Sequence, residues 1–119
     1  MLTELLKQVG KKCDTYLNDG TYLGCIYPVY FLYPQIPHYQ LKYTDKKLNY
    51  IYGMECINNH CIEINKDDLK SGDMIAAKFK DELHFAIYYE FNKIIHVFGG
   101  ELKIDKLSLF KNYRCFRVV

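Results

Sequence analysis

The sequence predicts a single α+β domain, spanning residues 1–119, in which N-terminal helices pack on a mostly antiparallel β-sheet. The chain of 119 residues is long enough for one core and too short for two ordinary domains. Half of its residues are hydrophobic and a quarter are charged, which is typical of a folded chain. Apolar residues recur at helical spacing near the N-terminus and alternate further on, so we expect helices first and strands after them.

The first predicted helix begins near the N-terminus. Apolar residues recur every three or four positions from Leu2 to Leu17, which is typical of an amphipathic helix. The turn-forming run Asn18-Asp19-Gly20 should end it. Cys13 lies on the apolar stripe, and we therefore expect it in the core.

A second helix is predicted to begin near Cys25. The apolar stretch from Cys25 to Tyr33 follows Gly24 and contains Pro28. Proline is tolerated in the first turn of a helix, where backbone N–H groups lack helical partners. This start would place Cys25 at a helix N-terminus.

Strands are expected through the rest of the chain, because short apolar runs are separated by turn-forming residues. Asn58-Asn59 indicates a hairpin, and Ser71-Gly72-Asp73 indicates a turn. The expected strands around these turns are Met54–Ile57, His60–Ile64 and Met74–Phe79.

Two further strands each contain a histidine. Apolar residues at 85, 87, 89 and 91 alternate with His84 and its neighbours, so His84 should lie on the less apolar face. The following strand, Ile94–Phe98, contains His96. A two-residue turn at Asn92-Lys93 would place the histidines on opposite faces, so a shared site requires a loop of odd length or a bulge.

The charge balance gives no reason to expect nucleic acid or membrane as a partner. Sixteen Lys and Arg residues against fourteen Asp and Glu residues give a net charge of +2. The five cysteines cannot all pair, and the first residues lack the apolar core of a signal peptide. We therefore expect reduced thiols and synthesis in the cytoplasm, and the sequence contains no apolar run long enough for a membrane helix.

Cys25 is the best candidate nucleophile. A thiol at a helix N-terminus experiences the positive end of the helix dipole, which should lower its pKa. His84 could act as its base, and His96 could orient the His84 ring. The alternatives are a buried, inert thiol with two hydrogen-bonded histidines, and Cys13 as a rival nucleophile.

Zinc binding is a second possible chemistry, involving Cys56, His60 and Cys61. These three residues lack an evident fourth ligand, and neighbouring strand residues point to opposite faces. Ordinary strand positions explain them better, so we expect no metal and no cofactor.

Several segments together resemble a known family. Asp68–Ile75 combines a leucine, a Gly-Asp turn and a hydrophobic strand, and His84–Tyr88 and Ile94–Val97 place two histidines twelve residues apart. Cys25–Tyr30, followed by Ile36–Tyr39, is similar to a cysteine helix and an Ile-Pro-x-Tyr loop. In this order the segments resemble the NlpC-type cysteine peptidases of the papain-like superfamily, in particular their phage tail-associated branch.

This resemblance implies a papain-like fold and hydrolysis of peptidoglycan stem peptides at the amide between D-glutamate and the diamino acid. Cys25 would attack, His84 would transfer the proton, His96 would orient His84, and Tyr16 would line the substrate site. Backbone N–H groups at the start of the helix, including that of Cys25, would bind the oxyanion. The resemblance further implies other phage tail or lysis proteins as partners, and action at the cell wall after virion assembly or export.

Two other functions fit the same order of residues. A CHAP-type amidase has the same Cys-then-His order but cuts between sugar and peptide. The second is a structural module that keeps the fold but has lost catalytic turnover. The reason to consider it is that Gly24, Ile26 and Tyr27 differ from the family's usual residues around the cysteine.

Overall fold

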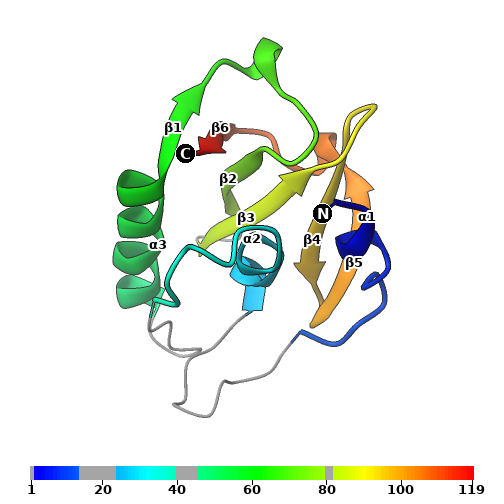
Figure 1. Cartoon of the computed structure of the whole chain (residues 1–119), viewed down its shortest axis with the longest axis horizontal. Helices are drawn as coiled ribbons and strands as arrows, with labels where there is room; N and C mark the ends of the chain where they lie inside the picture. The colour runs from blue at the N-terminus through cyan, green and yellow to red at the C-terminus, as the bar shows by residue number, and fades with distance from the viewer. Residues whose placement is uncertain (1, 14–23, 40–45, 80–81) are drawn as a thin grey trace.

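A six-stranded antiparallel β-sheet forms the centre of the computed structural model, which describes residues 2–13, 24–39, 46–79 and 82–119 (Figure 1). The strand order across the sheet is β1-β6-β2-β3-β4-β5. The strands are β1 (Cys61–Ile64), β2 (Met74–Phe79), β3 (Glu82–Tyr88), β4 (Lys93–Phe98), β5 (Glu101–Lys106) and β6 (Tyr113–Val118). The predicted α+β class and antiparallel sheet are confirmed.

Within the described residues, three α-helices and three short 3-10 turns accompany the sheet. They are α1 (Leu2–Leu6), η1 (Gly24–Ile26), α2 (Tyr27–Leu32), α3 (Lys46–His60), η2 (Lys66–Asp68) and η3 (Leu107–Leu109). Among the described residues, no helix is long and apolar enough to cross a membrane.

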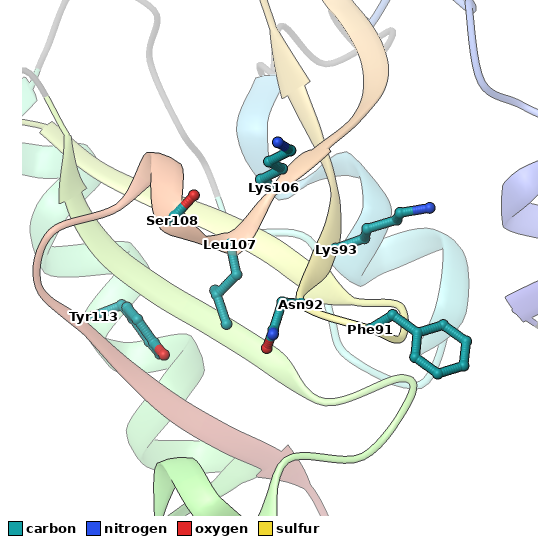
Figure 2. A pocket seen from close by; sticks show the side chains of 7 residues that line it. All are labelled: Phe91, Asn92, Lys93, Lys106, Leu107, Ser108 and Tyr113. Carbon is teal, nitrogen blue, oxygen red and sulfur yellow. The ribbon is translucent and has the colours of Figure 1, made fainter.

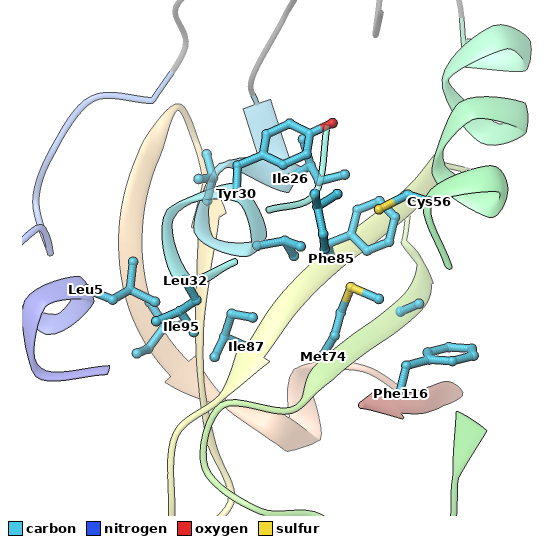
Figure 3. Close-up of a cluster of buried hydrophobic side chains, with 14 of the residues drawn as sticks. Leu5, Ile26, Tyr30, Leu32, Cys56, Met74, Phe85, Ile87, Ile95 and Phe116 are labelled. Carbon is cyan, nitrogen blue, oxygen red and sulfur yellow. The ribbon is translucent and has the colours of Figure 1, made fainter. Parts of the chain in front are cut away.

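Strand alternation divides the sheet into two buried faces. The first, which we name the helical face, packs Met74, Phe85 and Ile95 against side chains from α1, α2 and α3 (Figure 3). The second, which we name the opposite face, packs Ala86 and Ile94 against η3 and the residues after it. Residues at even positions of β3 and β4 therefore lie on the opposite face.

The N-terminal helix is shorter than predicted. It ends at Leu6, and residues 7–10 form a turn that closes at Gly10, whose φ of +97° suits glycine. The chain then runs beside β5, because the Gly10 N–H donates to the Leu102 carbonyl at 2.8 Å and the Cys13 N–H to the Gly100 carbonyl at 2.9 Å. Cys13 is buried as predicted, but on an extended segment, and residues 14–17 lie outside the described residues.

The predicted hairpin around Asn58-Asn59 is wrong, because residues 46–60 form α3 and the strand begins only at Cys61. Buried positions in this helix recur at helical spacing, at Gly53, Cys56 and Ile57. A Cβ on Gly53 would lie 2.6 Å from Leu83 Cδ2, so this glycine lets the helix approach β3 closely. Packing against a distant strand therefore decides the conformation of this segment.

Candidate active site

The strands β3 and β4 separate along most of their length. Their ladder consists of two residue pairs next to the connecting loop, Ile87 with Ile95 and Tyr88 with Ile94. Beyond these pairs the strands diverge (Figure 1). The 3-10 turn η1 packs against both of them. We name this opening the β3–β4 split.

Cys25 lies in η1 and reaches the β3 edge of this split. Its thiol donates a hydrogen bond to the Leu83 carbonyl oxygen at 3.7 Å, and the backbone N–H of Phe85 also faces the sulfur. In an antiparallel strand, alternate residues direct their backbone groups to the same edge, so the groups of Leu83 and Phe85 point toward β4. The sulfur therefore lies at the edge of β3 where β4 would otherwise form backbone hydrogen bonds. It contacts the main chain of the residues that precede and follow His84.

The pKa of Cys25 is raised to about 11, which contradicts the lowered pKa expected from a helix N-terminus. Burial is the largest cause, the Phe85 N–H opposes it, and the Glu82 carboxylate adds to it. The predicted helix start is close, since η1 begins at Gly24 and Pro28 lies in the first turn of α2. However, α2 itself begins at Tyr27 and has six residues, and the cost of burying a thiolate outweighs its dipole.

The two predicted histidines lie in direct contact. Tyr88 pairs with Ile94, and the number of residues between them is odd (89–93). His84 and His96 therefore lie on the same side of the sheet, which is the one named the opposite face. Their rings meet with His84 Nε2 and His96 Nδ1 2.9 Å apart. The pKa of His84 is lowered to about 4, first because the ring is buried and then because of the neighbouring His96.

Asp105 extends this contact, and the sequence analysis did not predict it. Its Oδ2 lies 2.6 Å from His96 Nε2. The aromatic rings of Phe98 and Phe110 surround His96, Phe98 nearly parallel with a centroid distance of 5.8 Å and Phe110 edge-on at 6.0 Å. We name the series His84, His96 and Asp105 the histidine relay.

A turn at Gly99-Gly100 could have indicated Asp105 in advance. A two-residue hairpin pairs Phe98 with Glu101, as the structure does, and the same register places Asp105 on the face of His96. The sequence analysis considered only the two strands that contain histidines, and so did not predict β5, the strand that contains Asp105.

The remaining predicted site residues lie elsewhere. Tyr16 lies outside the described residues. Cys56 and His60 belong to α3 and not to strands, which corrects their predicted positions, and His60 Nε2 lies 3.0 Å from the Tyr39 hydroxyl. No group of three or more potential metal ligands occurs in the part of the chain that the structure describes.

A cavity of about 410 Å³ lies beside the β3–β4 loop and η3 (Figure 2). It is lined by Phe91, Asn92, Lys93, Lys106, Leu107, Ser108 and Tyr113. None of these residues belongs to the relay or to η1. The cavity therefore lies outside the candidate active site.

Family models and curated sequences give no relative from which a function could be transferred. No protein-family model matches the chain, and a search of curated proteins finds no significant match. The chemistry of the site therefore rests on the geometry of its own residues.

Proposed function

We propose that this chain is a cysteine peptidase of NlpC type, with a papain-like arrangement of Cys25, His84 and His96. The observation that carries the proposal is the position of the Cys25 thiol beside the main chain of His84, at one end of a relay that runs through His96 to Asp105. A nucleophile, a base and an orienting group in this order are what thiol hydrolysis requires.

The proposed reaction begins with a neutral thiol and a neutral imidazole. Because the pKa of Cys25 is raised and that of His84 is lowered, a preformed ion pair is disfavoured. His84 would accept the thiol proton as the sulfur attacks the amide carbonyl, and would return it to the leaving amine when the C–N bond breaks. Water, activated by His84, would then hydrolyse the thioester and restore the thiol.

The oxyanion formed in the first step needs hydrogen-bond donors near the sulfur. The backbone N–H of Cys25 faces its own sulfur, and it belongs to the short 3-10 turn of η1. It is therefore the donor that we propose for the oxyanion. The reaction needs no cofactor.

The proposed substrate is a peptidoglycan stem peptide, cut between D-glutamate and the diamino acid. This assignment rests on the resemblance of the cysteine and histidine segments to NlpC-type peptidases. It extends to action at the cell wall after virion assembly or export, with other phage tail or lysis proteins as partners.

Mass spectrometry of digested peptidoglycan tests the proposal. The wild-type chain should release products with a new free amine on the diamino acid and an intact bond between sugar and peptide. The Cys25→Ser variant should release none, whereas Cys61→Ser, a matched change at another partly buried thiol, should retain activity. New free lactyl groups on muramic acid would instead identify an amidase of CHAP type.

A structural module without turnover is the second candidate, and the burial of Cys25 favours it. A thiol whose pKa is raised to about 11 and whose proton is donated to the Leu83 carbonyl resembles an inert core cysteine. A folded wild-type chain that releases no products, with a Cys25 no more reactive toward iodoacetamide than Cys61, would favour this function over the peptidase.

A further inference from the structure

We propose that the cavity beside the β3–β4 loop and η3 binds a small organic anion. Lys93 and Lys106 would hold its carboxylate or phosphate group, and its apolar part would pack against Leu107. The cavity shares no residue with the histidine relay or with η1. Binding there would therefore be independent of the proposed peptidase activity.

The cavity has the size and the mixed lining of a site for a small ligand. Its volume of about 410 Å³ lies within the usual range of such sites. Leu107, which is buried, and the ring of Tyr113 supply apolar surface, and Asn92 and Ser108 supply polar groups. Figure 2 shows the side chains of Leu107, Asn92 and Tyr113 close together, with the two lysine chains extending from the strand ends beside them.

Two lysines on adjacent strands supply positive charge at the rim of the cavity. Lys93 begins β4, Lys106 ends β5, and the two are direct partners in the ladder, so their side chains leave the sheet on the same side. Both are exposed, and neither forms an ion pair with any described residue. Like charges directly opposite each other destabilise a sheet. An anion bound by both ammonium groups would replace this repulsion with attraction.

The acids nearest to these lysines in sequence are engaged elsewhere. The Glu90 carboxylate accepts a hydrogen bond from the Tyr89 hydroxyl, and Asp105 Oδ2 lies 2.6 Å from His96 Nε2. Among the described residues, none that lines the cavity is acidic. The charge around the cavity therefore favours an anionic ligand over a cationic one.

The neutral groups of the lining can complete the binding of an anion. The hydroxyl of Ser108 and the side-chain amide of Asn92 form no hydrogen bond with the part of the chain that the structure describes, and both can donate to an anionic oxygen. Burial raises the pKa of Tyr113, so its hydroxyl also remains a donor. The Lys66 ammonium lies 4.2 Å from the centroid of the Tyr113 ring and adds a third positive charge beside the cavity.

Main-chain hydrogen bonds join the walls of the cavity, so the site is already formed without a ligand. The Leu107 N–H donates to the Asn92 carbonyl at 2.7 Å and links η3 to the β3–β4 loop. Within this loop, the Lys93 N–H donates to the Glu90 carbonyl at 3.0 Å, and the Tyr89 N–H donates to the Lys93 carbonyl at 2.9 Å. A ligand therefore orders few groups when it binds, which keeps the entropic cost of binding low.

Titration of the full chain with small organic anions, followed by ¹H–¹⁵N NMR, tests the proposal. The probes are benzoate, phenyl phosphate and benzamide, the last of which is the neutral counterpart of benzoate. One or both anions should shift the amide signals of residues 91–93, 106–108 and 113 saturably, and the tighter of the two identifies the preferred anionic group. Benzamide should bind about tenfold more weakly, because it cannot form the two ion pairs.

Lysine variants test the source of the affinity. Lys93→Gln and Lys106→Gln should each weaken binding of the tighter anion by about threefold and leave binding of benzamide unchanged. Neither should lower the melting temperature of the free chain, because each substitution also removes the repulsion between the lysines. Lys78→Gln, a matched change at an exposed strand lysine that does not line the cavity, should keep the wild-type affinity.

Three results would overturn the proposal. The first is the absence of saturable shifts at the cavity with both anions, and the second is binding of benzamide as tight as that of benzoate. The third is wild-type affinity for the anion in folded Lys93→Gln and Lys106→Gln, which would leave the lysine pair as a solvated surface feature.

Discussion

The pH dependence of Cys25 alkylation distinguishes a thiol activated by His84 from an inert one. With a pKa of about 11, the thiolate makes up about one part in ten thousand at pH 7. Without a base, the rate of reaction with iodoacetamide should follow the thiolate and rise about a thousandfold from pH 6 to pH 9. His84, with a pKa of about 4, is neutral throughout this range, so a rate assisted by it should stay nearly constant.

We therefore expect a nearly flat profile for Cys25 in the wild type and a tenfold rise per pH unit in His84→Gln. Alkylation is measured by peptide mass spectrometry at limiting reagent, so that each of the five cysteines is followed separately. His38→Gln, a change at an exposed histidine outside the relay, should keep the wild-type profile. A wild-type profile that rises with the thiolate, and that His84→Gln does not alter, would refute activation by His84.

Two further predictions concern stability. The pKa of folded His84 lies below its ordinary value of 6.5, so its contribution to stability is fully present above that pH and is lost as the pH falls toward 4. The free energy of unfolding, measured with urea, should fall by about 3 kcal/mol over this range. His84→Gln should abolish this pH-dependent decrease. Gly53→Ala should lower the free energy of unfolding by about 1 kcal/mol in calorimetry, because the new Cβ meets Leu83 and Phe85, and their displacement outweighs the gain in helix propensity.

Each stability prediction has its own comparison. Other acidic groups titrate equally in the wild type and in His84→Gln, so only the difference between their pH profiles is informative, and a constant difference would contradict the lowered pKa. For Gly53, the control is Asn58→Ala at an exposed position of the same helix, which should not destabilise the chain. A Gly53→Ala variant as stable as the wild type would mean that α3 can move away from β3.

Local sequence patterns predicted the strands more accurately than the helices. β2 and β4 lie at the expected residues because each follows a turn and consists of apolar side chains. The segment that became α3 contains a turn-forming Asn58-Asn59 pair and apolar residues on several sides, so its local pattern favoured a hairpin. Its helical form depends on contact with β3, a strand that is distant in sequence. The local pattern of apolar residues cannot reveal this contact.

The candidate site shows the same division. The histidine pair could be predicted, with a stated condition on loop length, because strand register is simple arithmetic once the turn is known. The raised pKa of Cys25 could not be predicted, because it depends on the burial of the thiol, and this depends on how η1 packs into the β3–β4 split. A sequence can predict where a helix begins, and hence the effect of its dipole on a pKa. The effect of burial on the pKa can be known only from the folded chain.

The strands β3, β4 and β5 follow one another both in the chain and in the sheet, and this has a consequence for the order of folding. The relay contacts join residues 12 and 9 positions apart, whereas the Cys25 contact with Leu83 joins residues 58 positions apart. Closing the longer loop costs about 1.4 kcal/mol more in chain entropy than closing the 12-residue loop. The relay can therefore form early, while the thiol reaches Leu83 late, so a partly folded chain contains the proposed proton acceptor before the proposed nucleophile is in place.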